Sequence, residues 1–307
     1  MPQGKVTVVG SFLVGLTLRA ERFPAPGETV MAGDFDQGPG GKGSNQAVQA
    51  ARMGTDVEFV GAIGDDDFGE MAVKLFAAEG VGTSYLRRIT HLNTGLGFII
   101  LDRQGENRIL IDPGATGSFS VDDLRPARDR LDSSDVVITQ LEIPVETAAA
   151  AIKTAHVAGA TTILNPAPAR ELPPAMLSDI DVLTPNQVEA RILAGLDARD
   201  QRDDLDVCSL LLDRGVQCVI LTRGARGATI VRRDGHEHVD PWPVQVVDST
   251  GAGDAFNGAL AASLANGDPL PASARRAAAA GALACTKLGV IPSLPHPADI
   301  DELTASS

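Results

Sequence analysis

The chain has 307 residues, 44% of them hydrophobic, a composition that excludes a disordered or fibrous protein. Its 26 basic and 40 acidic residues give a formal charge of -14, which argues against nucleic acid or an anionic membrane as the main partner. The three cysteines and five histidines form no metal or redox motif, and no apolar run reaches membrane-spanning length. We therefore expect one domain over residues 1–307, located in the cytoplasm.

Short apolar runs alternate with amphipathic stretches along most of the chain. The runs 6–9, 57–60, 136–139, 161–164, 182–184 and 218–222 are predicted to be strands. The stretches 44–53, 68–79, 145–158, 187–193 and 205–213 are predicted to be helices. This alternation predicts a doubly wound, mostly parallel α/β sheet with helices on both faces and with ligands bound beyond the carboxyl ends of its strands.

Two segments, about 12–38 and 93–112, break the alternation, because they read as strands joined by turns without helices. We expect them to form a small separate β-sheet, which acts as a lid over the ligand site; a plain surface hairpin is the alternative. Such a lid is rich in apolar side chains, which predicts that its outer face contacts a second subunit in a homodimer. These side chains are Phe12, Leu13, Val14, Leu16, Leu18, Phe98, Ile99 and Ile100.

A glycine-rich loop over 38–43 opens the helix predicted next, with Lys42 and Asn45 near its start. It is not a P-loop, since Asp36 and Gly43 stand where that motif needs Gly and Ser or Thr. A dinucleotide-binding fingerprint after the first strand also fails, because the segment from Gly10 lacks the second glycine. A glycine hinge with a solvated Lys42 would explain the loop if it stood alone.

A second glycine-rich turn, Asp248-Ser-Thr-Gly-Ala-Gly-Asp254, lies between a predicted strand at 244–247 and a predicted helix at 255–264. The free N–H groups and the dipole of a helix start attract an anion, and Gly251 and Gly253 allow its close approach. Asp254 adds a carboxylate beside that anion, an arrangement suited to a hydroxyl that loses its proton while attacking a phosphoryl group. An ordinary turn with Asp254 as a capping residue is the alternative.

Together, GGKGSNQA at 40–47 and DSTGAGDAFNGA at 248–259 resemble the two signature segments of the phosphofructokinase-B family of carbohydrate kinases, in particular its ribokinase branch. The resemblance covers nearly the whole chain and includes the segments 23–29, 64–69, 165–170, 184–189 and 221–227 in family order. It implies an ATP-dependent kinase that transfers the γ-phosphoryl group to a primary hydroxyl of a sugar.

The resemblance also implies roles for single residues. Asp254 would be the catalytic base, and the N–H groups of Gly251, Ala252 and Gly253 would stabilise the transferring phosphoryl group. Asn186, Thr222, Gly224 and Gly227 would contact the nucleotide. Asn186 and Glu189 would organise Mg²⁺, partly through water, although their spacing also fits a helix-capping box. The expected K⁺ site, largely of backbone oxygens, comprises Asp248, Thr250, Ala284, Lys287, Gly289 and Ser293.

On the sugar side, the matching ligands are Gly41, Lys42, Asn45 and Glu142, together with Asp254. Leu13 and Gly15, however, stand where ribokinases carry an Asn and an Asp that bind the sugar. Without these partners, ribose hydroxyls would lose hydrogen bonds, so the acceptor stays open between ribose and another ketose, polyol, sugar acid or nucleoside. A catalytically silent sugar or nucleotide sensor is the alternative from a different class.

Overall fold

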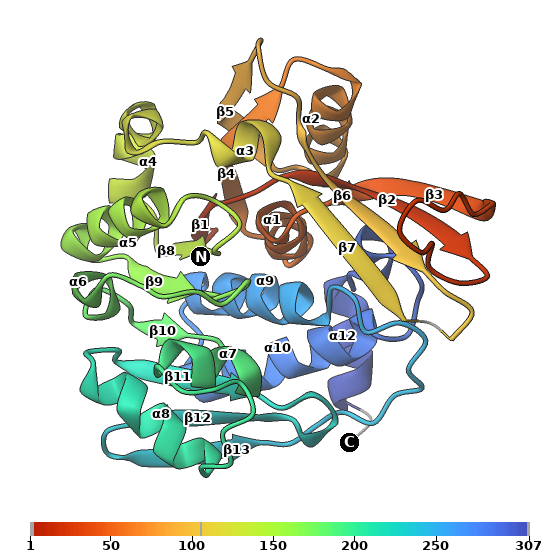
Figure 1. Ribbon diagram of the computed structural model, residues 1–307. Coiled ribbons are helices and arrows are strands. Elements are labelled where there is room, and N and C mark those ends of the chain that lie inside the picture. The colour runs from red at the N-terminus through yellow and green to blue at the C-terminus, as the bar shows by residue number, and fades with distance from the viewer. Residues whose placement is uncertain (1–2, 105, 306–307) are drawn as a thin grey trace.

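The computed structural model describes residues 3–104 and 106–305, and its centre is a nine-stranded sheet covered by helices (Figure 1). The strand order is β13-β12-β11-β10-β9-β8-β1-β4-β5, and all neighbours from β11 to β5 pair in parallel. Only β12 and β13 pair antiparallel, at one edge. The strands are β1 (Lys5–Val9), β4 (Asp56–Gly64), β5 (Gly82–Ile89), β8 (Val136–Thr139), β9 (Thr161–Leu164), β10 (Val182–Leu183), β11 (Cys218–Thr222), β12 (Ala228–Arg232) and β13 (Gly235–Val239).

The connections between these strands are mostly helical, as parallel pairing requires. The helices are α1 (Lys42–Arg52), α2 (Asp67–Glu79), α3 (Gly114–Gly117), α4 (Arg128–Asp132), α5 (Val145–Ala158), α6 (Pro174–Leu177), α7 (Gln187–Leu193), α8 (Asp204–Asp213), α9 (Ala252–Ala265), α10 (Leu270–Ala284), α11 (Val290–Ser293) and α12 (Pro297–Ala305). Short 3₁₀ helices cover Val121–Ala127 and Gly224–Arg226. Among the described residues, no helix combines the length and the apolar character that a membrane span needs.

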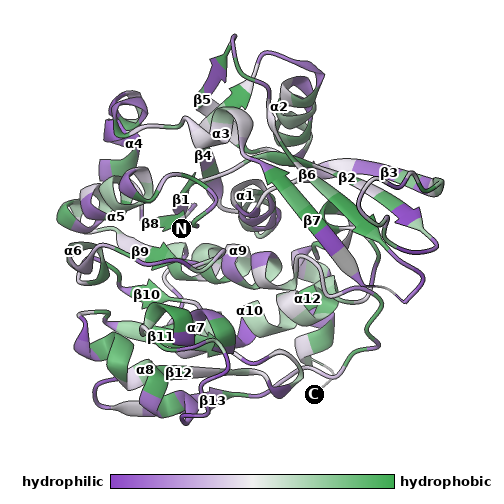
Figure 2. Cartoon of the chain, viewed as in Figure 1, coloured by the Kyte–Doolittle hydropathy of each residue, from purple (hydrophilic) through white to green (hydrophobic). Residues whose placement is uncertain are grey.

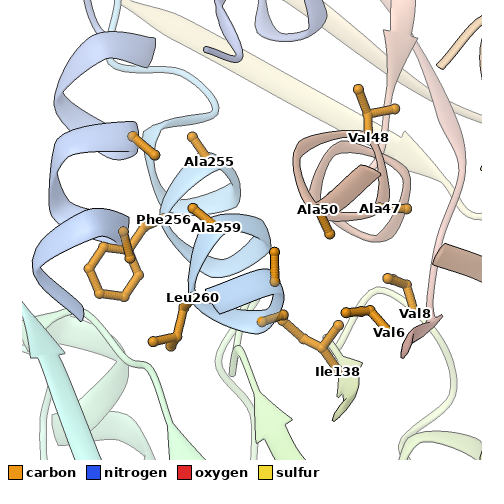
Figure 3. Packing of buried hydrophobic residues seen from close by; sticks show 14 of the residues in the cluster. Val6, Val8, Ala47, Val48, Ala50, Ile138, Ala255, Phe256, Ala259 and Leu260 are labelled. Carbon is orange, nitrogen blue, oxygen red and sulfur yellow. The ribbon is translucent and has the colours of Figure 1, made fainter. Parts of the chain in front are cut away.

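Two buried apolar clusters lie on the two faces of the central sheet, because neighbouring side chains of a strand point to opposite faces. Val8 of β1 belongs to the cluster that includes α1, α9 and α10, whereas Val9 belongs to the one that includes α5 and α8. Figure 3 shows Val6 and Val8 of β1 and Ile138 of β8 beside small residues of α1 and α9. The doubly wound α/β architecture expected from the sequence is therefore confirmed.

Helices α1 and α9 pack unusually closely, since both carry small residues where they meet. Ala47 and Ala50 on α1 and Ala255 and Ala259 on α9 are fully buried. A Cβ atom on Gly258 would lie 2.6 Å from the backbone oxygen of Gln46, so only glycine fits there. This contact brings the start of α1 to the start of α9, and those two helix starts carry the glycine-rich segments singled out in the sequence.

A separate four-stranded sheet projects from one side, in the order β3-β2-β6-β7 (Figure 1). Its strands are β2 (Leu13–Ala20), β3 (Ala32–Gly40), β6 (Gly95–Leu101) and β7 (Asn107–Asp112), which agrees with the expected insertions. The residue between them at position 105 lies outside the described residues. Figure 2 colours much of β6 and β7 as hydrophobic. Phe12, Leu13 and Val14 are nevertheless buried within the chain itself, so they do not belong to an exposed outer face.

The prediction of a strand at 244–247 is wrong. No strand lies between β13 and α9, and Val246 and Val247 are 63% and 60% exposed. Pro241 and Pro243 precede this segment and cannot donate to a sheet ladder. The N–H group of Val247 bonds instead to the carbonyl of Cys285, at 2.8 Å. Strands β5, β12 and β13 were not predicted. The exposed and polar residues of β5 and β13 lack the continuous apolar character of buried strands, whereas β12 is mostly buried and was missed despite its apolar residues.

Candidate active site

The carboxylate of Asp254 lies at the start of α9, where two amides from the start of α1 hold it. Asn45 Nδ2 donates to one carboxylate oxygen at 2.8 Å, and Gln46 Nε2 donates to the other at 3.0 Å. Asp254 is only 6% exposed, and Asn45 is 4% exposed. The Oδ1 atom of Asn45 is buried and has no hydrogen-bond partner in the described part of the chain. It can therefore accept a hydrogen bond from a hydroxyl bound next to Asp254.

Burial and the neighbouring positive charge and amides act on the pKa of Asp254 in opposite directions. Burial raises the pKa of Asp254, while the Lys42 ammonium group and the amides of Asn45 and Gln46 act in the opposite direction. Burial alone would lower the pKa of Lys42, but the carboxylates of Asp254, Glu142 and Glu189 outweigh it and raise that pKa. Lys42 is therefore charged and compensates a cluster of acidic groups, rather than lying solvated on a hinge.

The predicted sugar ligands lie together beside this carboxylate. Glu142 Oε2 accepts the backbone N–H of Lys42 at 2.8 Å and also accepts the hydroxyl of Ser11. Gly41 has φ +91°, and a Cβ atom there would lie 2.8 Å from the backbone nitrogen of Leu13, so the loop needs glycine. The loop before α1, the turn after β1 and the end of β8 thus meet at one place.

The two positions that depart from the family pattern lie on the small sheet, next to this place. Leu13 pairs with Gly40 and Gly95, and Gly15 pairs with Gly38 and Gly97, so one face carries almost no side chains there. A Cβ atom at Gly15 would find its nearest neighbours at 3.8 and 4.0 Å, which is ordinary contact. The fold therefore does not require glycine at position 15, and a larger residue would fit.

The turn before α9 has the backbone conformation of an anion site. Gly251 is the N-cap in the left-handed region, with φ +83°, and a Cβ atom there would lie 2.6 Å from Val290. The N–H of Ala252 lies 3.3 Å from the carbonyl of Ser249, so it is already partly engaged. Gly253 has open space around its Cα, which lets a phosphoryl group approach the first turn of α9.

A cavity of about 830 Å³ opens beside this turn. Ala252 and Gly253 line it, and so do the predicted nucleotide residues Asn186, Thr222, Gly224 and Gly227. Trp242, Phe256, Ala278, Ala282 and Cys285 make much of the remaining wall apolar. The cavity has the size and character of a site for a flat aromatic group, with the polar anion turn at its border.

Asn186 and Glu189 form a capping box at the start of α7. Asn186 Oδ1 accepts the N–H groups of Val188 and Glu189, each at 2.9 Å, and Glu189 Oε2 accepts the N–H of Asn186 at 2.8 Å. These hydrogen bonds show that Asn186 and Glu189 cap α7, as the alternative interpretation of their spacing predicts. Burial raises the pKa of Glu189, although its backbone hydrogen bond and the charge on Lys42 oppose that shift. The Lys42 charge attracts both Glu189 and Asp254, whereas the two carboxylates repel each other.

The segments expected to hold K⁺ lie against each other. Asp248 Oδ1 accepts the N–H and the hydroxyl of Thr250, at 2.9 and 2.7 Å. The N–H of Asp248 donates to the carbonyl of Cys285, next to Ala284, and Gly251 contacts Val290, next to Gly289. Ser293 is buried in the same region, and Lys287 is exposed. Carboxylate and backbone oxygens are hard ligands that suit an alkali cation, so this donor set fits.

Sequence reasoning gave no role to several residues of this site. Gln46, Gln140 and Asn165 are buried polar residues next to Asp254, and Ser11 binds Glu142. A signal was present, because Gln140 and Asn165 directly follow the predicted strands 136–139 and 161–164. Trp242, by contrast, lies in an irregular segment and carries no motif that could have indicated a role in the site.

Comparison with known proteins identifies the family of this chain. The model of the pfkB family carbohydrate kinases matches residues 3–297. A ribokinase of Haemophilus influenzae is 35% identical over 290 residues, covering 94% of this chain and 95% of that protein. A bifunctional ribokinase/ribose-5-phosphate isomerase A of Fructilactobacillus sanfranciscensis is 40% identical over 261 residues, covering 85% of this chain; this chain spans 48% of that longer protein.

A solved structure agrees with the sequence matches. Arabidopsis thaliana ribokinase, complexed with ribose and ATP, superposes with a TM-score of 0.91 at 30% identity, over 98% of both chains. The chain belongs to the pfkB family of carbohydrate kinases. The predicted resemblance to the ribokinase branch and the expected sugar-kinase class are thereby confirmed.

Proposed function

We propose that this kinase transfers the γ-phosphoryl group of ATP to a primary hydroxyl of a sugar, with Asp254 as the base. The observation that carries the proposal is the buried carboxylate of Asp254, which directly follows Ala252 and Gly253, two residues that line the cavity of about 830 Å³. Asp254 takes the hydroxyl proton as the sugar oxygen attacks the phosphorus, and the bond to ADP breaks. The N–H groups of Gly251, Ala252 and Gly253 stabilise the transferring group.

In this proposal the nucleotide occupies the cavity lined by Asn186, Thr222, Gly224 and Gly227, with its phosphates toward the start of α9. No three His, Cys, Asp or Glu side chains of the described residues gather in a way that could hold a metal ion. Mg²⁺ would therefore be bound mainly by the phosphates and water, with Asn186 and Glu189 as outer partners. Asp248 and the neighbouring backbone oxygens would hold K⁺ and stabilise the anion turn.

The acceptor sugar would be held by Gly41, Lys42, Asn45 and Glu142. The free Oδ1 atom of Asn45 supports this position for a hydroxyl. Leu13 and Gly15 offer no polar side chain, so we propose an acceptor that makes fewer hydrogen bonds to the small sheet than ribose would, or one that is bulkier at that place. Ketoses, polyols, sugar acids and nucleosides stay candidates.

The test is a coupled ADP-release assay with pentoses, hexoses, ketoses, sugar acids and nucleosides, on the native chain and on Asp254→Asn. We expect one acceptor class to stimulate ADP release and the variant to lose about 10²- to 10⁴-fold in turnover. The fold should persist, because the Asn45 amide can rotate and present its free Oδ1 to the new amide. Near-normal turnover of the variant would refute the assignment of the base, and a failure of every acceptor in the panel to stimulate ADP release would favour a sensor.

We also propose a homodimer formed through the small sheet. Leu16, Phe98 and Leu110 stand in register on the face opposite Leu13 and Gly15, and Leu110 is 72% exposed. An apolar row of this kind is typical of a subunit contact. Sedimentation should give twice the chain mass, reduced to the single mass by Leu110→Glu.

We propose the cytoplasm as the compartment, in keeping with three cysteines that form no disulfide.

A further inference from the structure

The Asp254 carboxylate is the first member of a chain of buried amides whose direction it determines. A carboxylate can only accept, so Gln46 must present its Nε2 atom to Asp254, at 3.0 Å. Its Oε1 atom then faces Gln140, whose Nε2 donates to it at 2.6 Å. Because Gln140 fixes one end of the amide and Asp254 the other, the Gln46 side chain has a single satisfied orientation.

The Gln46 amide is also linked by hydrogen bonds to residues that follow the next strands, β9 and β10. Gln46 Nε2 also donates to Asn165 Oδ1 at 3.1 Å, and Asn165 Nδ2 donates to the carbonyl of Thr184 at 3.3 Å. The Thr184 hydroxyl donates to Asn257 Oδ1 at 2.6 Å, and Asn257 Nδ2 donates to the carbonyl of Gly253 at 2.8 Å. Since Gly253 and Asp254 are neighbours in the first turn of α9, the bonds close into a ring.

The ring members are anchored on rigid parts of the fold. Gln140, Asn165 and Thr184 directly follow β8, β9 and β10, three adjacent strands of the central sheet. Gln46 and Gln140 are fully buried, and Thr184 and Asn257 are each 1% exposed. The ring lies behind the carboxylate, with no part in holding ATP or the sugar in the proposed function. Polar groups this deeply buried are costly unless they are fully paired, so their arrangement resists distortion.

We infer that the ring of Gln46, Asn165, Thr184 and Asn257 positions the Asp254 carboxylate against the anion turn, with Gln46 as its principal positioning residue. This inference rests on the proposed role of Asp254 as base. The ring sets the orientation of the carboxylate plane and holds the first turn of α9 at a fixed place relative to it. Base and phosphoryl site therefore keep one geometry while substrates enter and leave.

Loss of this positioning should lower kcat. Gln46→Met keeps a side chain of similar length but donates nothing, so the carboxylate loses one of its two amide partners and its orientation. We expect kcat to fall about 10- to 100-fold, the size of effect that a misplaced catalytic group produces, while KM for ATP and for the acceptor stays within about threefold. Thr184→Val breaks the ring at the opposite side and should lower kcat without changing either KM.

The matched control is Gln49→Met. Gln49 lies on the same helix, is also fully buried, and donates to the carbonyl of Pro295 instead of to the ring. Gln46→Met removes three buried hydrogen bonds, to Asp254, Asn165 and Gln140, and Gln49→Met removes one, so the thermal unfolding temperature should fall in both and further in Gln46→Met. Only Gln46→Met should lose kcat. The acid limb of its pH profile should also move upward, since Lys42, Glu142 and Glu189 stay in place around Asp254 while one donor disappears.

A double-variant cycle completes the test. Gln46→Met and Thr184→Val together should lower kcat by clearly less than the product of the single effects, because either change alone opens the ring. Equal kcat for Gln46→Met and Gln49→Met, or a strictly multiplicative double variant, would overturn the inference. If Gln46→Met does not fold, Asn165→Leu opens the ring at the next member, and its combination with Thr184→Val gives the equivalent cycle. An active Asp254→Asn would instead refute the proposed function, so the two failures are distinguishable.

Discussion

Asn45 and Asp254 lie 209 positions apart in the sequence, and a 2.8 Å hydrogen bond joins the Nδ2 atom of one to the carboxylate of the other. In the proposed function, this bond links the start of α1, which would hold the acceptor, to the start of α9, which would hold the phosphoryl group. It leaves Asn45 Oδ1 as the free acceptor of the pair. The Asn45–Asp254 contact would therefore join the two halves of the proposed reaction.

The first prediction concerns pH. Burial raises the pKa of Asp254 above the ordinary value of about 3.9. A base works only when ionised, so kcat/KM should rise as pH increases through this raised pKa and fall on the acid side of it. The acid limb of the profile should therefore lie above the range of an exposed Asp. Lys42→Met removes the opposing positive charge, and its limb should move to still higher pH; a limb unchanged by this substitution would contradict the prediction.

The second prediction separates capping from metal binding at Glu189. Gln is accepted at this position of a capping box, so Glu189→Gln should keep the unfolding temperature close to that of the native chain. If the carboxylate organises hydrated Mg²⁺, the concentration of Mg²⁺ for half-maximal activity should rise about 10- to 100-fold. A magnesium titration followed by ADP release measures this. An unchanged Mg²⁺ requirement would leave Glu189 as a cap only.

The third prediction concerns the monovalent cation. We expect higher activity in K⁺ buffer than in Na⁺ buffer of equal ionic strength. Asp248→Asn preserves the acceptor for the Thr250 N–H and hydroxyl but removes the charge. This variant should need more K⁺ for half-maximal activity and should fold normally. Equal rates of the native chain in both cations would argue against a K⁺ site in this turn.

The fourth prediction concerns the acceptor. A Cβ atom at Gly15 meets only ordinary contacts, so Gly15→Asp should fold and restore one polar partner on the small sheet. Each restored hydrogen bond stabilises a bound ribose by about 1 to 3 kcal/mol, so kcat/KM for ribose should rise about 5- to 150-fold. Leu13→Asn is expected to act in the same direction. Should the native chain already use ribose best of the whole panel, the two positions do not set its specificity.

The fifth prediction uses the single tryptophan of the chain. Trp242 lines the large cavity, and its indole N–H lies 3.3 Å from the carbonyl of Arg275. Nucleotide bound there would cover the ring and change its fluorescence in a saturable way. ATP and ADP titrations should give this change in the native chain and none in Trp242→Phe. Catalytic saturation by ATP without any fluorescence change would mean that the nucleotide binds elsewhere.

The sequence was sufficient to predict the parallel core, because each of its buried strands is a short apolar run. Segments 136–139, 161–164 and 218–222 match β8, β9 and β11 residue for residue. The edge strands escaped prediction, since β13 is mostly exposed and carries Gly235, His236 and His238 instead of an apolar run. At 244–247 the apolar residues face a cavity and solvent, and composition alone cannot distinguish that from a strand.

For the site, the motifs predicted which residues meet but not what holds them. The proximity of Asn45, Glu142 and Asp254 could be expected from the family resemblance, and the structure brings them together. The supporting amides Gln46 and Gln140 could not be assigned, because Gln46 lies inside a helix, Gln140 follows a buried strand, and a polar residue at either place has many possible partners. Only three-dimensional pairing shows that the hydrogen bonds of Gln46 run to both Asp254 and Asn165.

The missing side chain at Gly258 has a consequence for evolution and engineering of this enzyme. Adding a single methyl group there would force α1 away from α9, since its carbon would lie 2.6 Å from the backbone oxygen of Gln46. In the proposed function, α1 would hold the acceptor and α9 carries the base Asp254, so even a small separation of the two helices would move the acceptor away from the base without changing either. The absence of a side chain at Gly258 therefore sets the distance between α1 and α9, on which the proposed chemistry depends.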